Sequence, residues 1–356
     1  MKDKEKTTIY DISKKLNVSA ATVSRALNDS PKISSLTKEL VLKTAKEMNY
    51  KQNRLALALK SGKSNNVGVI VPYINRNFFS SVIRGIEEEL TPHGYHVIIC
   101  QTHENVEFEA KQINTLLDTQ IDGIFMSVSK TTRNTDHIKK IRDQGTPLVF
   151  FDRKIEIEGV SAVTVDDFKG GFMATEHLIN QGCTRIAHFS GDLNLEIYTN
   201  RYEGYKAALK KHDIPLYPEL VMMVSSKIES GADAVTKLWD LKNKPDAIFS
   251  AGDHNALGAI QELRRKKVRI PQDICVVGFS NEPFTKYMEL PITSVDQTPQ
   301  MMGKIAAEVF LEQIEGKQTL TIEKKVVLTP ELCIRASSDR KIKKLNPGVP
   351  VKIKTN

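Results

Sequence analysis

The sequence predicts an all-α head, with a helix-turn-helix and a hinge helix, joined to a two-lobed α/β body built on two doubly wound parallel sheets. Three observations predict this fold class. Apolar residues recur at helical spacing near the N-terminus, short apolar runs then alternate with longer amphipathic ones, and positive charge gathers at the two ends. A chain of 356 residues with 40% hydrophobic and 26% charged residues fits a globular protein of two or three domains.

The charge distribution indicates what the head binds. Residues 1–62 hold 13 Lys and Arg against 6 Asp and Glu, and residues 340–356 hold 6 basic residues and no acidic one, which leaves −5 on the residues between. A basic head on an acidic body favours a polyanionic partner. The tail at 340–356 contains two prolines and no periodic apolar pattern, so we expect a solvated basic segment.

Several classes of protein are disfavoured by the sequence. No apolar run approaches the roughly 20 residues of a membrane helix, and the charged start leads into no signal-peptide core, so we expect a cytoplasmic protein that does not bind membranes. The four cysteines are far apart and form no metal-ligand pattern, and no cofactor is expected. Nucleotide-binding, zinc-hydrolase and serine-hydrolase motifs are absent, so the body is expected to be a binder rather than an enzyme.

The head contains the spacing of a helix-turn-helix. Residues 8–16 have apolar side chains at helical spacing, and Asn17 can adopt the left-handed conformation that a tight turn requires. Ser19 can cap a second helix over residues 20–27, and Ser34 a third. In such a unit the second helix enters the major groove of DNA, and its N-terminal residues contact base edges.

The exposed face of the second helix supplies the candidate DNA contacts. Arg25 can donate two hydrogen bonds to guanine, and the methyl groups of Ala20 and Ala21 can contact thymine. Hydroxyl and amide side chains can bind phosphates, which positions the head without reading sequence. The candidates for this role are Tyr10, Ser19, Thr22, Ser24 and Asn28.

Residues 53–60 form a short helix-prone stretch with three leucines and no core of its own. Eight residues are too few for a stable isolated helix. The segment is either a linker or a hinge that folds when DNA and a second copy are present, and a hinge could wedge an apolar side chain into the minor groove.

The body alternates predicted strands and helices from residue 67 to residue 278, and a last helix and strand follow at 301–315 and 321–328. About ten strands fit two lobes better than one sheet. Open α/β sheets bind ligands beyond the carboxyl ends of their strands, so the cleft between the lobes is the expected site.

Candidate ligand contacts follow from chemistry and position. Phe78 and Phe79 come just after the first strand, where a ring could stack on a sugar or pack against the following helix. Arg201 can donate hydrogen bonds to hydroxyl groups or to an anion, and Asp253 can accept hydrogen bonds from two hydroxyl groups. Each residue could instead lie on the surface of a helix or cap a helix. Ser127 and Asp152 end further strands and are weaker candidates.

The head resembles the DNA-binding domain of the LacI/GalR family of bacterial transcription regulators, through residues 18–28 above all. Residues 64–338 resemble the effector-binding and dimerisation domain of that family, which is similar to periplasmic sugar-binding proteins. The motifs that carry this second resemblance are residues 166–171, 174–178, 201–205, 251–258, 270–273 and 276–279.

The resemblance implies roles for particular residues. Ala20, Ala21, Arg25 and Ala56 match base-reading positions, and Leu59 matches the leucine that is inserted at the operator centre, with Asn53 as a phosphate contact beside it. Three departures stand out. Gln52 replaces the usual proline, Leu57-Ala58 replaces polar or basic residues, and Ser280 replaces an aspartate effector ligand unless Glu282 takes that role.

The expected domains are a DNA-binding domain at 7–62 with the hinge helix at 53–60, an effector domain at 64–338, and the basic tail. Lobe 1 is expected at about 64–161 plus 294–322, and lobe 2 at about 162–293 plus 323–338.

The sequence therefore predicts a sequence-specific DNA-binding transcriptional regulator. Repression is favoured over activation, and a homodimer is expected on near-palindromic double-stranded operator DNA. By resemblance, a small effector such as a sugar or sugar derivative binds between the lobes. Two alternatives stay open: an effector domain that binds a coregulator protein, for which Ser280 is an argument, and a solute binder that does not bind DNA, against which the basic head argues.

Overall fold

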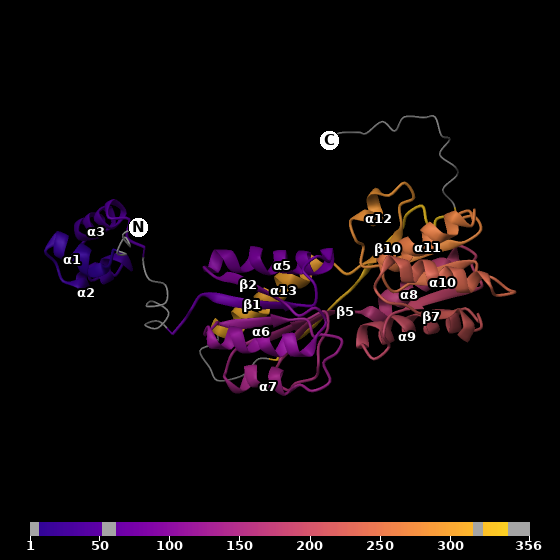
Figure 1. The fold of residues 1–356 in the computed structure, drawn as a ribbon, viewed down its shortest axis with the longest axis horizontal. Helices are drawn as coiled ribbons and strands as arrows, with labels where there is room; N and C mark the ends of the chain where they lie inside the picture. Colours follow the sequence, from indigo (N-terminus) through magenta and orange to yellow (C-terminus); the bar gives the residue numbers. More distant parts are fainter. Residues whose placement is uncertain (1–6, 52–61, 316–322, 341–356) are drawn as a thin grey trace, which may run out of the picture. The chain divides into compact units, whose positions relative to one another are not determined.

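The computed structural model describes residues 7–51, 62–315 and 323–340. The chain divides into two compact units, Met1–Ser64 and Asn65–Asn356, called here the head and the body (Figure 1). The hinge stretch at 53–60 and nearly all of the basic tail lie outside the described residues.

The head is built from three helices: α1 (Ile9–Leu16), α2 (Ala20–Leu27) and α3 (Ser35–Glu47). Local interactions set their ends. The Thr8 N–H donates to Asp11 Oδ2 over 2.8 Å, Asn17 ends α1 in the left-handed conformation with φ 51°, and Ser19 Oγ accepts from the Thr22 N–H over 3.0 Å. The predicted helix-turn-helix is confirmed, and its small core consists of Ile12, Val23, Ala26, Val41 and Ala45.

Two six-stranded sheets make up the body within the described residues, one in each lobe. The first has the order β11-β5-β4-β3-β1-β2, and all its pairs are parallel. The second has the order β12-β10-β9-β8-β6-β7, in which only β12 runs antiparallel to its neighbour. The strands are β1 (Asn66–Val71), β2 (His96–Gln101), β3 (Gly123–Met126), β4 (Leu148–Phe151), β5 (Ser161–Val165), β6 (Ile186–Ser190), β7 (Val221–Met223), β8 (Ala247–Ser250), β9 (Cys275–Phe279), β10 (Thr293–Asp296), β11 (Lys325–Leu328) and β12 (Glu331–Cys333).

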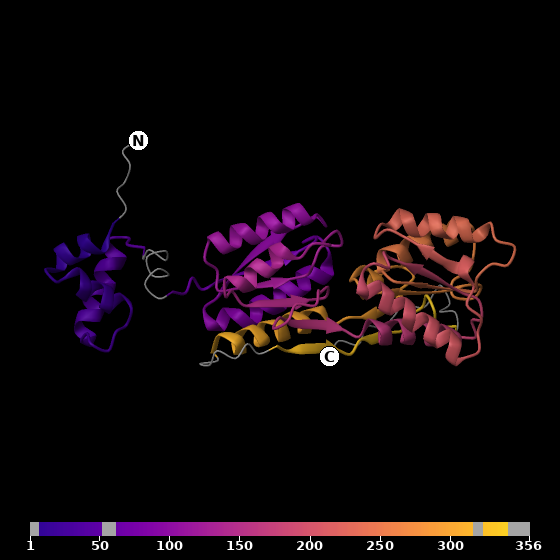
Figure 2. The ribbon, with the colours of Figure 1, turned by 90° about the horizontal axis from the view of Figure 1, so that it is seen from below.

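Helices cover both faces of each sheet, as expected for right-handed crossovers (Figure 2). They are α5 (Asn77–Leu90), α6 (Val106–Asp118), α7 (Asp136–Asp143), α8 (Asp167–Asn180), α9 (Glu196–Lys211), α10 (Ile228–Trp239), α11 (Asp253–Arg265), α12 (Phe284–Tyr287) and α13 (Pro299–Glu315), with the 3-10 turns η1 (Thr91–His93) and η2 (Pro218–Leu220). None of the helices in the described part of the chain is long and apolar enough to cross a membrane.

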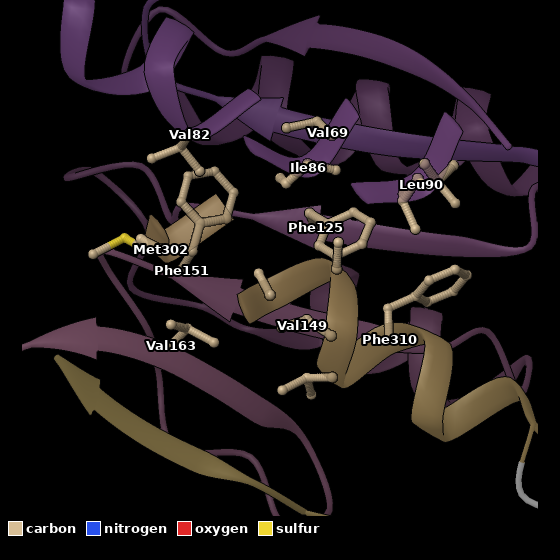
Figure 3. Close-up of a cluster of buried hydrophobic side chains, with 14 of the residues drawn as sticks. Val69, Val82, Ile86, Leu90, Phe125, Val149, Phe151, Val163, Met302 and Phe310 are labelled. Atoms are coloured by element: carbon tan, nitrogen blue, oxygen red, sulfur yellow. The ribbon is translucent and has the colours of Figure 1, made fainter. Parts of the chain in front are cut away.

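The core of the first lobe brings together distant parts of the chain. Helix α13, from the C-terminal part, packs Met302 and Phe310 against Phe125 and Val149 of the sheet and against α5 (Figure 3). The two-lobed architecture with two doubly wound sheets is thus the one that the alternation of apolar runs predicts.

The boundaries between the two lobes differ from those that the sequence predicts, at each point where the chain passes from one lobe to the other. Strand β5 stays in the first sheet to Val165, and β11, expected in lobe 2, pairs in parallel with β5. Strand β10, expected in lobe 1, pairs with β9 in the second sheet. The chain therefore crosses a few residues later than expected, because the sheet that a strand joins is decided by hydrogen-bonded pairing between distant segments and not by local sequence.

Candidate functional site

Helix α2 presents the predicted base-reading residues on the side of the helix opposite the head's core. Ala21 and Arg25 are exposed and Ala20 is half-buried, whereas Val23 and Ala26 are buried against α1 and α3. Residues four apart share a helix face, so Ala21 and Arg25 lie together. Within residues 7–51 the Arg25 guanidinium has no ion pair or hydrogen bond, and it is thus available for an external acceptor.

The predicted phosphate contacts lie along α2 from its N-cap, Ser19, to its C-cap, Asn28, with Tyr10 on α1. Tyr10 is 70% exposed on α1, while Thr22 and Ser24 are half-buried on α2. Ser19 and Thr22 share a hydrogen bond of 2.9 Å between their hydroxyls, and Asn28 Nδ2 donates to the Ser24 carbonyl over 2.7 Å. These side chains are therefore oriented by the cap and by the end of α2.

The candidates in the hinge stretch cannot be placed in the same way. Asn53, Ala56 and Leu59 lie outside the described residues, as do the departures at Gln52 and Leu57-Ala58. Their roles remain predictions from the sequence.

The body holds a cavity of about 130 Å³ between its two lobes, at the carboxyl ends of the strands. Most lining segments lie at or just after the end of a strand: β1, β2 and β4 in the first lobe, and β6, β7, β8, β9 and β10 in the second. Ile197, Tyr198 and Arg201 line the cavity from α9. The lining includes six of the seven predicted effector contacts, namely Phe78, Phe79, Asp152, Arg201, Asp253 and Ser280.

Ser127 is the seventh candidate, and it does not line the cavity. Its hydroxyl is fully buried and donates to Asp152 Oδ2 over 3.0 Å. Ser127 thus holds the carboxylate of Asp152, which does line the cavity, and a direct contact of Ser127 with an effector stays a prediction.

Phe78 and Phe79 both pack in the core around α5 and line the cavity, which are the two roles that the sequence leaves open for them. Their rings meet edge to face with centroids 5.2 Å apart, both residues are more than 90% buried, and both belong to the core around α5. Each also lines the cavity, so α5 packing presents an aromatic wall to the cleft.

Arg201 is anchored on three sides. Its Nε donates to Asp167 Oδ1 over 2.7 Å, Nη1 donates to the Ala251 carbonyl over 2.9 Å, and Nη2 donates to Gln297 over 3.2 Å. Its guanidinium lies 3.7 Å from the centre of the Phe279 ring. Three of the five N–H groups are thereby used, which leaves two for a ligand.

Both carboxylate oxygens of Asp253 also accept hydrogen bonds from other residues of the body. Oδ1 accepts from the Ser294 hydroxyl over 2.7 Å, and Oδ2 accepts from the Glu282 N–H over 2.8 Å. Burial raises the pKa of Asp253 to about 7, and these two hydrogen bonds oppose that rise. Burial likewise raises the pKa of Asp167 to about 6, opposed by the charge of Arg201.

Ser280 lies on the cavity wall with φ 107°, and its hydroxyl accepts from Gln297 Nε2 over 3.0 Å. Gln297 therefore bridges Ser280 and Arg201. Sequence reasoning missed Gln297 because it did not predict β10, the strand that ends one residue before it.

Other lining residues were missed although the position of each after a strand was a usable signal. They are Tyr73, Arg76, Glu104 and Tyr198. Glu104 receives two hydrogen bonds from Arg153 Nη1, at 2.8 and 3.0 Å, while the buried Nε of Arg153 makes no hydrogen bond among the described residues and lies 3.8 Å from Asp152 Oδ2. The cavity wall thus carries aromatic rings, arginines and carboxyls side by side.

A helix-turn-helix head joined to a body of two α/β lobes with a cavity between them is the architecture of a DNA-binding protein with a ligand-binding domain. Two family models match the chain: "Bacterial regulatory proteins, lacI family" over residues 8–53, and "Periplasmic binding proteins and sugar binding domain of LacI family" over residues 64–332. The chain belongs to the LacI family of bacterial transcriptional regulators. The relatives below are regulators, and this protein is a DNA-binding transcriptional regulator rather than an enzyme.

Similar proteins span almost the whole chain. The transcriptional regulator DegA of Bacillus subtilis (strain 168) is 30% identical over 94% of this chain and 98% of its own, and catabolite control protein A of Priestia megaterium is 31% identical over 91% and 96%. Among solved structures, a CelR–cellobiose complex is 28% identical with TM-score 0.70 over 93% and 100%. The operator-bound lac repressor dimer, 22% identical with TM-score 0.83 over 94% and 99%, shares the fold.

Proposed function

We propose that this protein is a cytoplasmic repressor that binds near-palindromic operator DNA as a homodimer and responds to a sugar or sugar derivative in the cleft. The observation that carries the proposal is the cavity wall, where Phe78 and Phe79 stand beside Arg201 and Asp253 at strand ends from both lobes. Aromatic faces with bidentate polar groups suit a polyhydroxylated ring.

The balance of charge in the cleft supports a neutral ligand. Arg201 is paired with Asp167 at 2.7 Å and Arg153 with Glu104 at 2.8 Å. Since these two of the three lining arginines are already paired with carboxylates, hydroxyl groups match their remaining donors better than an anion does. The cellobiose complex of CelR and the ribose operon repressor of Halalkalibacterium halodurans, 31% identical over 87% of this chain, agree with a sugar.

In the head, we assign base reading to Ala20, Ala21 and Arg25, and phosphate contacts to Tyr10, Ser19, Thr22, Ser24 and Asn28. The exposure of Arg25 on α2 supports this assignment. Ala56 would add a base contact, Asn53 a phosphate contact and Leu59 a minor-groove wedge from the hinge stretch. The domains at 7–62 and 64–338 would then carry DNA binding and effector binding respectively.

In-vitro selection of random duplex DNA by the full-length protein tests DNA recognition. The expected product is a near-palindrome with a pyrimidine–purine step at its centre, since such steps kink easily. Recovery of no motif, with and without sugars present, would contradict sequence-specific recognition.

Isothermal titration against a panel of neutral sugars, sugar phosphates and sugar acids tests the effector class. Heat from a neutral sugar, lost in the Arg201→Lys variant, is the expected result. The absence of heat for every compound, together with a clear operator, would favour the coregulator-binding alternative that Ser280 first suggested.

A further inference from the structure

One carboxylate of the first lobe is fully buried outside the lining of the cavity. It belongs to Glu109 on α6, whose side chain has no exposed surface. Oε2 accepts a hydrogen bond from the Ser129 N–H over 2.7 Å, and Oε1 accepts one from the Thr132 hydroxyl over 2.7 Å. Oε1 also lies 2.8 Å from Nε2 of His137 on α7. Burial acts to raise the pKa of Glu109, but the hydrogen bonds outweigh it and hold the pKa below its usual value, so the group is charged at neutral pH.

These contacts fix the segment between β3 and α7. A buried carboxylate is stable only while its hydrogen-bond donors stay in place, because an unpaired buried charge is strongly unfavourable. Two of the donors, Ser129 and Thr132, lie in this segment, and the Ser129 hydroxyl also donates to Thr102 Oγ1, just after β2, over 2.8 Å. Residues 129–132 are therefore held both by α6 and by the end of β2.

Residues 130 and 131 in turn hold Glu104. The Lys130 N–H donates to Glu104 Oε2 over 2.8 Å, and the Thr131 hydroxyl donates to the Glu104 carbonyl over 2.9 Å. Both His103 and Glu104 have the left-handed backbone conformation, with φ 54° and 59°, which costs free energy at residues other than glycine. Such a turn persists only where its surroundings determine it, so the contacts from residues 130 and 131 keep Glu104 in position.

Glu104 orients Arg153 on the cavity wall. Arg153 Nη1 lies 2.8 and 3.0 Å from the two carboxylate oxygens of Glu104, and both residues line the cavity. In the part of the chain that the structure describes, the Arg153 guanidinium makes no other hydrogen bond, and its Nε lies 3.8 Å from Asp152 Oδ2. The direction of this cation therefore depends on Glu104.

We propose that Glu109 is a positioning residue of the cleft. It holds residues 129–132, these hold Glu104, and Glu104 holds the Arg153 guanidinium at the cavity wall. Glu109 touches no ligand itself and would set the selectivity of the cleft through the direction of one cation. The role of that cation in recognition rests on the proposed function of the cleft as an effector site, whereas the series of contacts does not.

A carboxylate that stabilised only its own neighbours would give a different pattern of amide protection. Removal of Glu109 frees the Ser129 N–H in either case, because Glu109 is its acceptor. The Lys130 N–H has Glu104 as its acceptor and would stay protected if Glu109 acted only locally. Exchange at Lys130 therefore separates positioning from local stabilisation.

Hydrogen–deuterium exchange of the full-length protein, resolved to single amides and measured without DNA or any sugar, tests the first steps. Glu109→Ala should speed exchange of the Ser129 and Lys130 amides roughly tenfold, while amides in the centre of β1 stay unchanged. Glu109→Gln keeps one acceptor oxygen and should restore part of the protection at both. Glu107→Ala is the matched control, since this carboxylate is exposed on the same helix.

The Nε–H signal of Arg153 in nuclear magnetic resonance reports the last step. In protein that carries isotope-labelled arginine, this signal is identified by its loss in Arg153→Lys. Glu109→Ala should shift or broaden it, because the guanidinium loses its fixed direction. The Nε–H signal of Arg201, which is bonded to Asp167, should stay in place.

Unchanged exchange at Lys130, an unmoved Arg153 signal, or equal changes in the Glu107→Ala control would overturn the proposal. If Glu109→Ala does not fold, Glu109→Gln decides by the same two readouts: a smaller change in the same direction supports positioning, and no change contradicts it. Because no DNA or effector is present, a negative result leaves the proposed function untouched, and a failed sugar titration leaves the series of contacts standing.

Discussion

At the scale of single residues, Gly278 shows how closely the cleft is built. A Cβ at this position in β9 would collide with Oδ1 of Asp253. That oxygen accepts from Ser294, and the other carboxylate oxygen accepts from the N–H of Glu282. The absence of one side chain therefore allows one buried carboxylate to orient two segments of the cavity wall.

Arg25 should contribute base discrimination and not only attraction to DNA. Arg25→Ala should cost about 1–3 kcal/mol of operator binding and relax the base preference at one position in each half-site. Arg25→Lys keeps the charge but loses the planar fork, so it should relax the preference nearly as much while retaining more affinity. Selection and titration with each variant check this, and an equal loss on all sequences would reduce Arg25 to a phosphate contact.

Asp253 should make stability fall as pH rises. Its pKa is raised by burial from 3.8 to about 7, so the folded protein keeps a proton that the unfolded chain releases. The free energy of unfolding should therefore decline between about pH 4 and pH 7 and stay lower above that, by up to a few kcal/mol. Urea unfolding at several pH values should show this decline flattened in Asp253→Asn, and an unchanged slope in that variant would rule out Asp253 as its source.

At the scale of elements, three pairs of helices in the body pack closely together at glycine residues. Gly85 and Gly303 lie where α5 meets α13, Gly171 and Gly204 where α8 meets α9, and Gly231 and Gly258 where α10 meets α11. In each pair an added Cβ would meet the backbone of the facing helix. The helices can approach this closely only because these residues lack side chains.

Gly204→Ala tests the packing of α8 against α9, because close packing and helix propensity predict opposite changes in the free energy of unfolding. Intrinsic helix propensity favours alanine by about 1 kcal/mol, but the new Cβ would collide with the carbonyl oxygen of Phe168. Separation of α8 from α9 should lower the free energy of unfolding by about 1–3 kcal/mol and disturb the nearby pair Arg201–Asp167. Chemical denaturation measures it, and a more stable variant would mean that the helices adjust without cost.

At the scale of the whole molecule, positive charge is concentrated at the two ends of the chain, in residues 1–62 and 340–356. Residues 1–62 carry a net +7 and the region 63–339 a net −5. Binding of such a head to DNA releases counterions, so operator affinity should fall linearly with salt on logarithmic axes.

Removal of residues 341–356 tests whether the basic tail shares this role. If the tail is solvated, as its composition predicts, the salt slope of operator binding should be unchanged, whereas Arg25→Ala or loss of any true phosphate contact should alter binding clearly. Fluorescence anisotropy between low and moderate salt measures both slopes. A tail deletion that makes the slope shallower by about 1 or more would assign phosphate contacts to the tail.

The sequence by itself determined the head and the alternating plan of the body. The caps and turn of the head involve residues three or four apart, such as Thr8 with Asp11 and Ser19 with Thr22, so their geometry is encoded locally. The placement of the candidate effector contacts near strand ends follows from the parallel arrangement of the sheets, which is why six of the seven candidates line the cavity.

Only the tertiary structure decided which sheets β10 and β11 join, and that the hydroxyl of Ser127 binds the carboxylate of Asp152. These outcomes depend on partners far apart in the chain: Arg201 meets Asp167 across 34 positions and Gln297 across 96, and Arg76 meets Ser226 across 150. Such contacts arise when the lobes pack, because a side chain's local sequence sets its chemistry but not the distant group that it will meet.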